Sequence, residues 1–214
     1  MSGRDNTPEG QCQSLPDRLE VEFIRNPLMA TVKLARFKFP ARLLGRKDRV
    51  LDLGCGTGYG AYYYATMTEG EVVGVDGFAD LDFARRQFGR DNLSFVQGDL
   101  RALPGETAAR KFDVVVSIDV IEHFSKSEAT AIIGQVRKLL APAGMLILGT
   151  PNALSGAYRS AQSRSVHVHE FEPDELREIC DRQFRRTLMF SMNDEVVHTG
   201  FSKMAWFFYV LCIA

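Results

Sequence analysis

Two short segments of the sequence gather side chains that can move protons or bind metal ions. Asp119–Phe124 reads DVIEHF and contributes two carboxylates and an imidazole, and His167–Phe171 reads HVHEF and contributes two further imidazoles. These segments hold three of the four histidines of the chain. Imidazole changes charge near neutral pH, and a carboxylate can orient it or join it around a cation. Both segments are therefore candidates for general acid–base catalysis or for a divalent metal site.

The elements that must position these segments alternate along the chain. Short apolar runs, several of them ending in glycine or aspartate, are separated by stretches with helical spacing of apolar residues. We expect strands at 49–54, 71–76, 93–99, 112–119, 145–152, 187–193 and 204–214, and helices at 61–67, 81–88, 128–140 and 172–183. Apolar strands that alternate with helices form a parallel sheet covered on both faces. The sequence therefore predicts a doubly wound α/β fold.

The length of 214 residues suits one domain. Residues 1–20 are polar and predict a flexible tail, and residues 21–214 predict a single domain. Within it we expect N-terminal helices at 21–48, a cofactor-binding core at 49–152, a lid loop at 153–170, and a C-terminal helix with strands at 171–214. The loop is long and rich in serine and arginine, and long loops in compact domains are usually functional.

The composition points away from nucleic-acid and membrane partners. The chain has 26 basic and 27 acidic side chains, so its net charge is near neutral. The apolar run Met204–Ala214 has about half the length of a membrane-spanning helix, and its aromatic and β-branched residues favour a buried strand. Four cysteines without a CxxC pair, and an N-terminus without the apolar core of a signal peptide, favour the cytoplasm. The oligomeric state is left open.

A glycine-rich turn follows the first expected strand. The stretch VLDLGCGTGYG carries Gly54, Gly56 and Gly58, so the backbone can turn tightly and approach a ligand without Cβ atoms in the way. Nucleotide-binding folds of several chemistries use such a turn. A dinucleotide motif GxGxxA can also be formed from Gly56, Gly58 and Ala61, so the turn by itself does not identify the ligand.

Carboxylates accompany this turn at the ends of three neighbouring strands. Asp52 lies two residues before the first glycine, and Asp76 and Asp99 close the second and third strands. Ligands bind at this edge of open α/β sheets. Carboxylates would repel a pyrophosphate but favour a ligand with an ammonium group, a sulfonium and a ribose diol. We expect Asp76 to bind the ribose hydroxyls and Asp99 the adenine amino group, with Phe78 against the adenine ring.

In order and spacing, these motifs resemble those of class I S-adenosylmethionine-dependent methyltransferases. The resemblance covers residues 49–152 and includes the glycine turn, GDL at Gly98–Leu100, FDVVVSIDVIEH and LLAPAGMLILGTPN. It implies S-adenosyl-L-methionine as the cofactor and a seven-stranded, Rossmann-like sheet, mostly parallel with a reversed last strand. The cofactor-binding residues that it implies are Asp52, Gly54, Gly56, Gly58, Asp76, Gly77, Phe78, Asp99, Leu100, Asp119 and His123.

The segment DVIEHF allows two interpretations. In the first, Asp119 and Glu122 favour the N-terminus of the next helix and His123 packs beside the cofactor, as in many small methyltransferases with a similar D-x-x-E-H. In the second, the segment resembles the E-x-x-E-H of small-RNA 2′-O-methyltransferases, which add a histidine from a later His-rich stretch. That resemblance implies a divalent metal held by Asp119, Glu122, His123 and His167, with His169 as the alternative to His167.

The fourth histidine, His198, lies in SMNDEVVHTGF between the last two expected strands. A parallel strand ends there and its antiparallel neighbour begins, so this connection lies at the ligand-binding edge of the sheet. We therefore expect all four histidines to converge on one opening. YRSAQSRSVHVH and FSMNDEVVHTGFSKMAWFFYVL resemble the C-terminal halves of bacterial methyltransferases of capsule and lipopolysaccharide biosynthesis. This implies a sugar-linked or phosphoryl-linked hydroxyl as the acceptor, although HVHEFEPDEL departs from that group.

A hydroxyl acceptor has to lose a proton when it is methylated. The candidate general bases are His167, His169 and His198, oriented by a carboxylate such as Asp119. Arg159 and Arg164 of the lid loop can clamp an anionic group of a small-molecule acceptor.

Three other functions are weighed against small-molecule O-methylation. The metal-like residue set and the basic stretch Lys33–Arg49 suggest a metal-assisted RNA 2′-O-methyltransferase, but the near-neutral net charge counts against it. A non-catalytic cofactor-binding module would need the glycine turn but not the histidines. An NAD-dependent dehydrogenase would need a substrate domain, which the sequence lacks.

Overall fold

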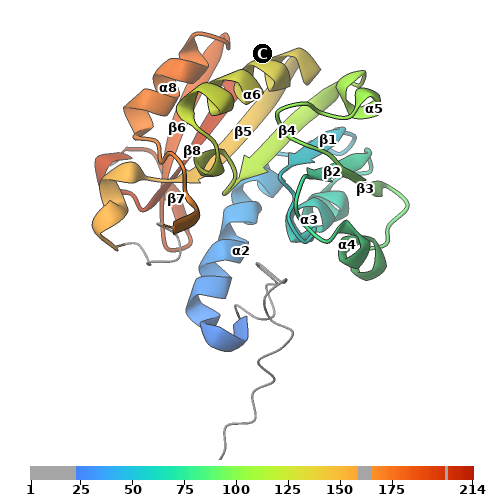
Figure 1. The fold of residues 1–214 in the computed structure, drawn as a ribbon, viewed down its shortest axis with the longest axis horizontal. Helices are drawn as coiled ribbons and strands as arrows, with labels where there is room; N and C mark the ends of the chain where they lie inside the picture. The colour runs from blue at the N-terminus through green and yellow to red at the C-terminus, as the bar shows by residue number, and fades with distance from the viewer. Residues whose placement is uncertain (1–22, 159–164, 201) are drawn as a thin grey trace, which may run out of the picture.

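The computed structural model describes residues 23–158, 165–200 and 202–214. Within these residues a central sheet carries helices on both faces (Figure 1). The expected tail at 1–20 and the two loop arginines, Arg159 and Arg164, lie outside the described residues.

The sheet confirms the predicted doubly wound topology with a reversed last strand. Its order over the described residues is β3-β2-β1-β4-β5-β8-β6-β7. The strands are β1 (Val50–Leu53), β2 (Val72–Asp76), β3 (Leu93–Gln97), β4 (Phe112–Ile118), β5 (Leu140–Pro151), β6 (Arg186–Asn193), β7 (Val196–His198) and β8 (Phe207–Ile213). Neighbours among β1 to β5 pair in parallel, whereas β8 runs antiparallel between β5 and β6. The glycine turn and DVIEHF therefore leave the sheet at the same edge.

The sheet differs from the expected seven strands by one short strand. β7 pairs antiparallel with β6 across a tight turn in which Asp194 has a φ of 50°. Aspartate tolerates this left-handed conformation, which suits a two-residue hairpin turn. The expected last strand starts three residues late, because Ser202–Met204 forms a 3₁₀ turn (η3). No helix among the described residues is long and apolar enough to cross a membrane.

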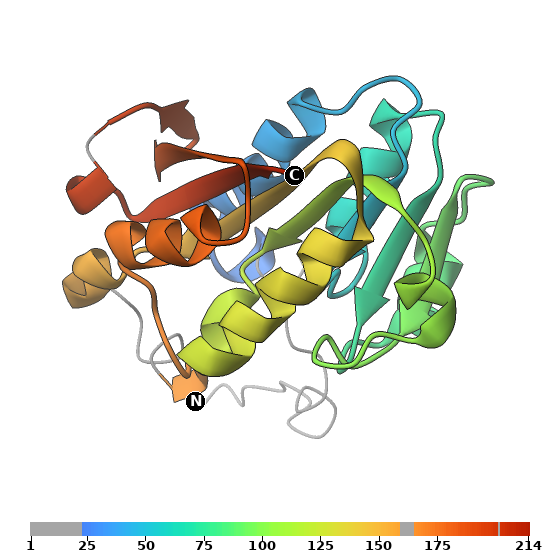
Figure 2. The ribbon, with the colours of Figure 1, turned by 90° about the horizontal axis from the view of Figure 1, so that it is seen from above.

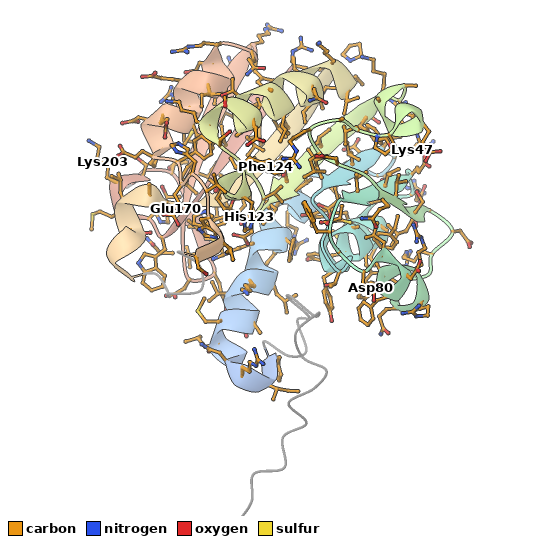
Figure 3. All side chains as sticks on the ribbon, viewed as in Figure 1. Lys47, Asp80, His123, Phe124, Glu170 and Lys203 are labelled. Atoms are coloured by element: carbon orange, nitrogen blue, oxygen red, sulfur yellow. The ribbon has the colours of Figure 1, made fainter. Side chains whose placement is uncertain are left out.

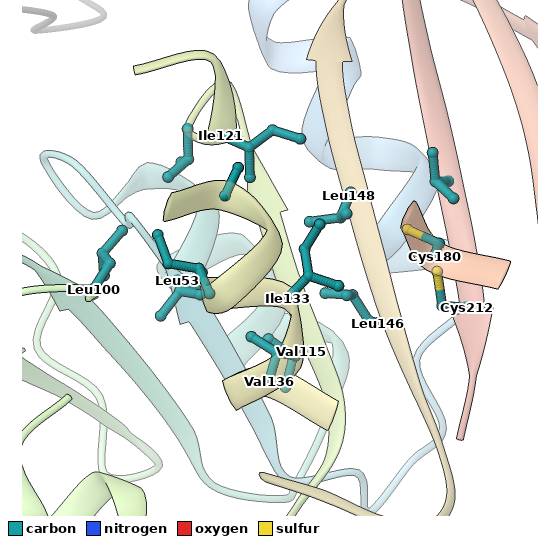
Figure 4. Close-up of a cluster of buried hydrophobic side chains, with 14 of the residues drawn as sticks. Leu53, Leu100, Val115, Ile121, Ile133, Val136, Leu146, Leu148, Cys180 and Cys212 are labelled. Carbon is teal, nitrogen blue, oxygen red and sulfur yellow. The ribbon is translucent and has the colours of Figure 1, made fainter. Parts of the chain in front are cut away.

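Helices cover the two faces of the sheet in two separate groups. The helices are α2 (Pro27–Arg42), α3 (Tyr59–Met67), α4 (Leu81–Gln87), α5 (Gly105–Ala108), α6 (Lys126–Leu139) and α8 (Pro173–Asp181). Buried residues of α2, α3 and α4 pack on one face, and those of α6 and α8 on the other (Figure 2). Figure 4 shows Ile133 and Val136 of α6 against Val115 and Leu146 of the sheet. Successive residues of β1 belong to opposite core layers, as the alternation of a strand requires.

The segment DVIEHF is fixed between a strand end and a capped helix. β4 ends at Ile118, and Ile121–His123 forms a single 3₁₀ turn (η1). Ser125 then caps α6: its Oγ accepts from the N–H of Glu128 at 3.3 Å, and Glu128 Oε2 accepts from the N–H of Ser125 at 3.0 Å. Ser125 and Glu128, and not Asp119 and Glu122, therefore cap this helix. The carboxylates of Asp119 and Glu122 make other contacts.

Candidate active site

The glycine turn has the tight, left-handed backbone that its glycines allow. Gly54, Gly56 and Gly58 have φ values of 80°, 54° and 95°, in the left-handed region that favours glycine. A Cβ on Gly54 would come within 2.4 Å of the side chain of Val120, whereas one on Gly56 would meet nothing within 4 Å. The turn therefore packs closely on the chain after β4 at Gly54 and opens at Gly56, where a ligand can approach the backbone.

Asp76 joins the end of β2 to this turn. Its Oδ2 accepts from the N–H of Gly56 at 2.9 Å, and its Oδ1 accepts from the N–H groups of Phe78 and Ala79 at 2.8 Å. Phe78 itself is 89% exposed. Asp76, Gly77 and Phe78 thus lie beside the glycine turn, which keeps them candidates for binding the ribose and adenine of the cofactor.

The other two strand-end carboxylates differ from each other. Asp52 is 2% exposed, and its Oδ2 has no hydrogen-bond partner among the described residues. Burial, and then repulsion from Asp76, raise the pKa of Asp52 to about 7. Asp99 is exposed and pairs with Arg101 at 3.0 Å, which lowers the pKa of its carboxyl. Leu100 is buried in the core layer that α6 covers, so its side chain packs in the core.

Asp119 is held by a residue that sequence reasoning did not select. Both of its carboxylate oxygens lie 2.6 Å from Nη1 of Arg36 on α2, and the two side chains are 33% and 16% exposed respectively. The guanidinium also lies 4.3 Å from the ring centroid of Phe207. Asp119 has a φ of 56°, a strained conformation for a non-glycine residue. This ion pair fastens α2 to the carboxyl end of β4.

Three of the four predicted metal ligands meet in one cluster. One ligand atom from each of Glu122, His123 and His167 lies within 4.8 Å of the other two. Asp119, the fourth predicted ligand, is not in this cluster and pairs with Arg36 instead. Glu122 is 1% exposed; its Oε2 accepts from Thr150 Oγ1 at 2.9 Å, and its Oε1 has no partner among the described residues. Burial, and then repulsion from Asp119, raise the pKa of Glu122 to about 8.

Hydrogen bonds orient both histidines of the cluster. Nδ1 of His123 lies 3.1 Å from the carbonyl oxygen of Val166, and Nδ1 of His167 lies 2.6 Å from Oε1 of Glu170. Both partners are acceptors, so each Nδ1 donates, and in the neutral form of either ring the lone pair is on Nε2. The two rings meet edge to face with centroids 5.2 Å apart. Figure 3 labels His123 and Glu170 close together above the end of α2.

The remaining two histidines lie in other surroundings. Nε2 of His169 is 3.2 Å from both carboxylate oxygens of Glu175 on α8, and its ring packs edge to face on Phe171. His198 lies on β7, opposite Ser191 of β6. Of the four histidines expected to converge, the structure therefore joins His123 and His167 in one cluster, and it selects His167 over His169 as the partner of Glu122.

The backbone explains why His167 reaches the cluster. The carbonyl oxygen of Glu122 accepts from the N–H groups of Val168 and His169 at 2.8 and 3.1 Å. These two hydrogen bonds attach the loop to η1 at Val168 and His169. The side chain of the preceding residue, His167, then lies beside His123. The loop end that sequence analysis treats as part of a lid is thus tied to the site.

The buried Glu122 carboxylate predicts how stability depends on pH. The pKa of Glu122 in the folded chain exceeds its value in the unfolded chain. At pH values between about 4.5 and 8 the folded chain therefore binds more protons than the unfolded chain. The free energy of unfolding should fall over this window, by up to about 1.4 kcal/mol per pH unit from this group. We expect Glu122→Gln to flatten the fall, measured by urea unfolding in chelator at several pH values. Glu106→Gln, on the surface helix α5, is the control; equal slopes for all three proteins would contradict the assignment.

Comparisons with known proteins match part of this chain to methyltransferases. Residues 50–144 match the family model described as a methyltransferase domain. A protein of Mycolicibacterium smegmatis named "Probable S-adenosylmethionine-dependent methyltransferase" is 31% identical over 134 residues, which are 62% of this chain and 49% of that protein. A ubiquinone biosynthesis O-methyltransferase of Bartonella tribocorum is 32% identical over 108 residues, 49% of this chain and 41% of that protein. The chain spans about half the length of the curated relatives it matches.

A solved structure extends the likeness to the whole fold. The DhpI–SAH complex superposes with a TM-score of 0.64 at 23% identity, over 90% of this chain and 89% of that one. Likeness at this identity shows the fold alone. Residues 50–144 therefore match a methyltransferase domain, and the chain is similar to proteins named S-adenosylmethionine-dependent methyltransferases.

Proposed function

We propose that this protein methylates a hydroxyl group of a small molecule, on a sugar-linked or phosphoryl-linked acceptor of the kind used in surface polysaccharide assembly. The observation that carries the proposal is the His167–Glu170 pair beside His123, at the edge of the sheet where the glycine turn lies. A histidine oriented by a carboxylate is the usual arrangement of a general base. A hydroxyl acceptor needs such a base.

The residues around the glycine turn fit the cofactor. S-adenosylmethionine, when bound, supplies a methyl group that its sulfonium already activates. Asp76 is positioned to accept from ribose hydroxyls, the exposed Phe78 ring offers a face for the adenine, and Gly56 leaves the backbone accessible. The buried carboxylate of Asp52, with one oxygen unpaired, suits a cationic group above the turn.

The remaining residues have roles that follow from their contacts. Nε2 of His167 takes the proton of the acceptor hydroxyl, while Glu170 holds the ring in position and stabilises the imidazolium that forms. Arg36 neutralises Asp119 and keeps the start of η1 in place. The described ends of the loop are held by backbone hydrogen bonds: Ala153 N–H donates to Phe171 O, and Val168 N–H donates to Glu122 O.

Cofactor binding tests the first half of the proposal. Asp76→Asn should weaken the binding of S-adenosylhomocysteine by roughly 10- to 100-fold, because a hydrogen bond to a charged group contributes about 1.5–3 kcal/mol. Calorimetric titration in the presence of chelator measures the affinity. Asp82→Asn, an equal charge change on the exposed side of α4, should leave it unchanged. If the unsubstituted protein does not bind S-adenosylhomocysteine, the proposed function is wrong.

Turnover tests the second half. With sugars and sugar phosphates as acceptors, His167→Ala should lower kcat by roughly 10²- to 10⁴-fold, the usual contribution of a general base, without changing the affinity for S-adenosylhomocysteine. Glu170→Gln should cause a smaller loss, because the amide oxygen can still accept from Nδ1. His169→Ala is the matched control, since His169 pairs with Glu175. A larger loss for His169→Ala than for His167→Ala would contradict the assignment of the base.

One observation favours a second candidate, a metal-assisted methyltransferase with an RNA 2′-hydroxyl as the acceptor. One carboxylate oxygen of Glu122 and one ring nitrogen each of His123 and His167 lie within 4.8 Å of one another, and Oε1 of Glu122 has no partner among the described residues. A divalent ion there would lower the pKa of a bound hydroxyl, and His167 would then be a ligand instead of a base.

Metal titration decides between the two candidates. A metal site predicts that the protein binds Mn²⁺ in calorimetry without any acceptor, that Glu122→Gln lowers this affinity at least tenfold, and that turnover stops in chelator. Glu178→Gln, an exposed glutamate on α8, should not change Mn²⁺ affinity. Turnover that persists in chelator, together with Mn²⁺ binding that Glu122→Gln does not weaken, would leave His167 as the base.

A further inference from the structure

A groove opens between α2, α3 and the β6–β7 turn, on the face of the sheet that α6 does not cover. Its volume is about 420 Å³, which is within the range of small-molecule sites. The residues that define it are Leu34 and Lys38 of α2, Tyr59, Tyr62 and Tyr63 of α3, and Glu195 of the turn. α3 begins at Tyr59, directly after the glycine turn, so the groove starts beside the cofactor site. It also includes the hairpin of the NDEVVHTGF motif.

Most of the groove wall is apolar or aromatic. Tyr59 and Tyr62 rest on Phe88 with ring centroids 5.0 Å apart, which holds the tyrosine side of the wall in place. On α2, the groove-lining residues share one helical stripe, and Leu28 continues that stripe at the same spacing. Leu28 and Leu34 are 68% and 43% exposed, on a helix whose first half projects beyond the carboxyl edge of the sheet (Figure 1). An apolar surface therefore continues from the groove along α2.

The helical walls of the groove carry one positive charge, that of Lys38, and no negative charge. The sequence of α2, PLMATVKLARFKFPAR, contains four basic residues and no acidic one, and that of α3, YGAYYYATM, contains no charged residue. Among these basic residues, Arg36 is neutralised by Asp119, whereas Lys38 is exposed on the groove itself. Glu195 is the acidic member of the groove lining. The charged groups of the groove are thus Lys38 on α2 and Glu195 on the β6–β7 turn.

We propose that this groove binds an amphiphilic anion, with an alkyl or aromatic body against Leu34 and the tyrosines and its phosphate or carboxylate at Lys38. Assigning this ligand as the part of the methyl acceptor remote from the reacting hydroxyl rests on the proposed function. It narrows the acceptor to a sugar-linked or phosphoryl-linked molecule that carries an apolar group.

Octyl phosphate, titrated calorimetrically into the full chain below its micelle-forming concentration and at low ionic strength, tests the proposal. We expect Lys38→Glu to weaken its binding about five- to tenfold and Glu195→Lys to strengthen it, because the two substitutions shift the local charge in opposite directions. Lys47→Glu is the matched control, since Lys47 precedes β1 and so lies at the opposite, amino edge of the sheet. Leu34→Ser should weaken binding without a charge change. Circular dichroism checks that each variant is folded.

Each other outcome would overturn the proposal in a specific way. Equal affinity for octyltrimethylammonium would show that the groove does not select an anion, and equal affinity for inorganic phosphate would show that the apolar wall contributes nothing. Equal losses for Lys38→Glu and Lys47→Glu would indicate attraction to the whole protein instead of a site. Parallel titration with S-adenosylhomocysteine separates the two hypotheses: its failure removes the proposed function, whereas failure of octyl phosphate alone removes the groove.

Discussion

The Glu122 carboxylate is almost completely buried, and one of its oxygens is without a hydrogen-bond partner among the described residues. An isolated charge in such a place is costly, so the group has to be protonated or matched by a cation. Its backbone carbonyl meanwhile accepts from Val168 and His169 and fixes the loop that delivers His167. The side chain of Glu122 therefore constrains the charge of the cluster, and its backbone constrains the position of His167. A proton on Glu122 and a metal ion beside it would each neutralise the same buried charge.

The ion pair between Arg36 and Asp119 connects the N-terminal helix α2 to the segment that contains Glu122. Asp119 has a left-handed backbone conformation, which is uncommon for residues other than glycine, and Arg36 holds its side chain in place. The carbonyl of Arg36 also accepts from the hydroxyl of Tyr209 on β8 at 2.9 Å. α2 is thus fastened to β4 and to the reversed strand at one position. This attachment also fixes the groove-lining side of α2 relative to α3.

Much of this arrangement was predictable from the sequence, and the exceptions have physical reasons. The glycine turn, Asp76 and the doubly wound sheet follow from local patterns, so they could be predicted. The reversed last strand, and the grouping of Glu122, His123 and His167, were expected from family resemblance instead. Arg36 could not be predicted, because its partner lies 83 positions away and it appeared as one of several basic residues on a helix. The choice of His167 over His169 depends on two acceptors, Glu170 and Glu175, whose directions only the folded loop determines. The short strand β7 depends on a turn at Asp194 that adds one pairing at the sheet edge.

The division of the chain explains why the chemistry of the cofactor is easier to assign than the identity of the acceptor. The residues that the family model matches, 50–144, contain the glycine turn, Asp76 and Glu122. His167 and Glu170, the groove side of α2 and the β6–β7 turn all lie outside that range. Under the proposed function, the shared segment holds the methyl donor and the flanking segments select the acceptor. In this chain those segments combine an oriented histidine with an apolar groove that carries Lys38 and Glu195. On that proposal, acceptor specificity should follow changes in α2 and the hairpin far more than changes in the core.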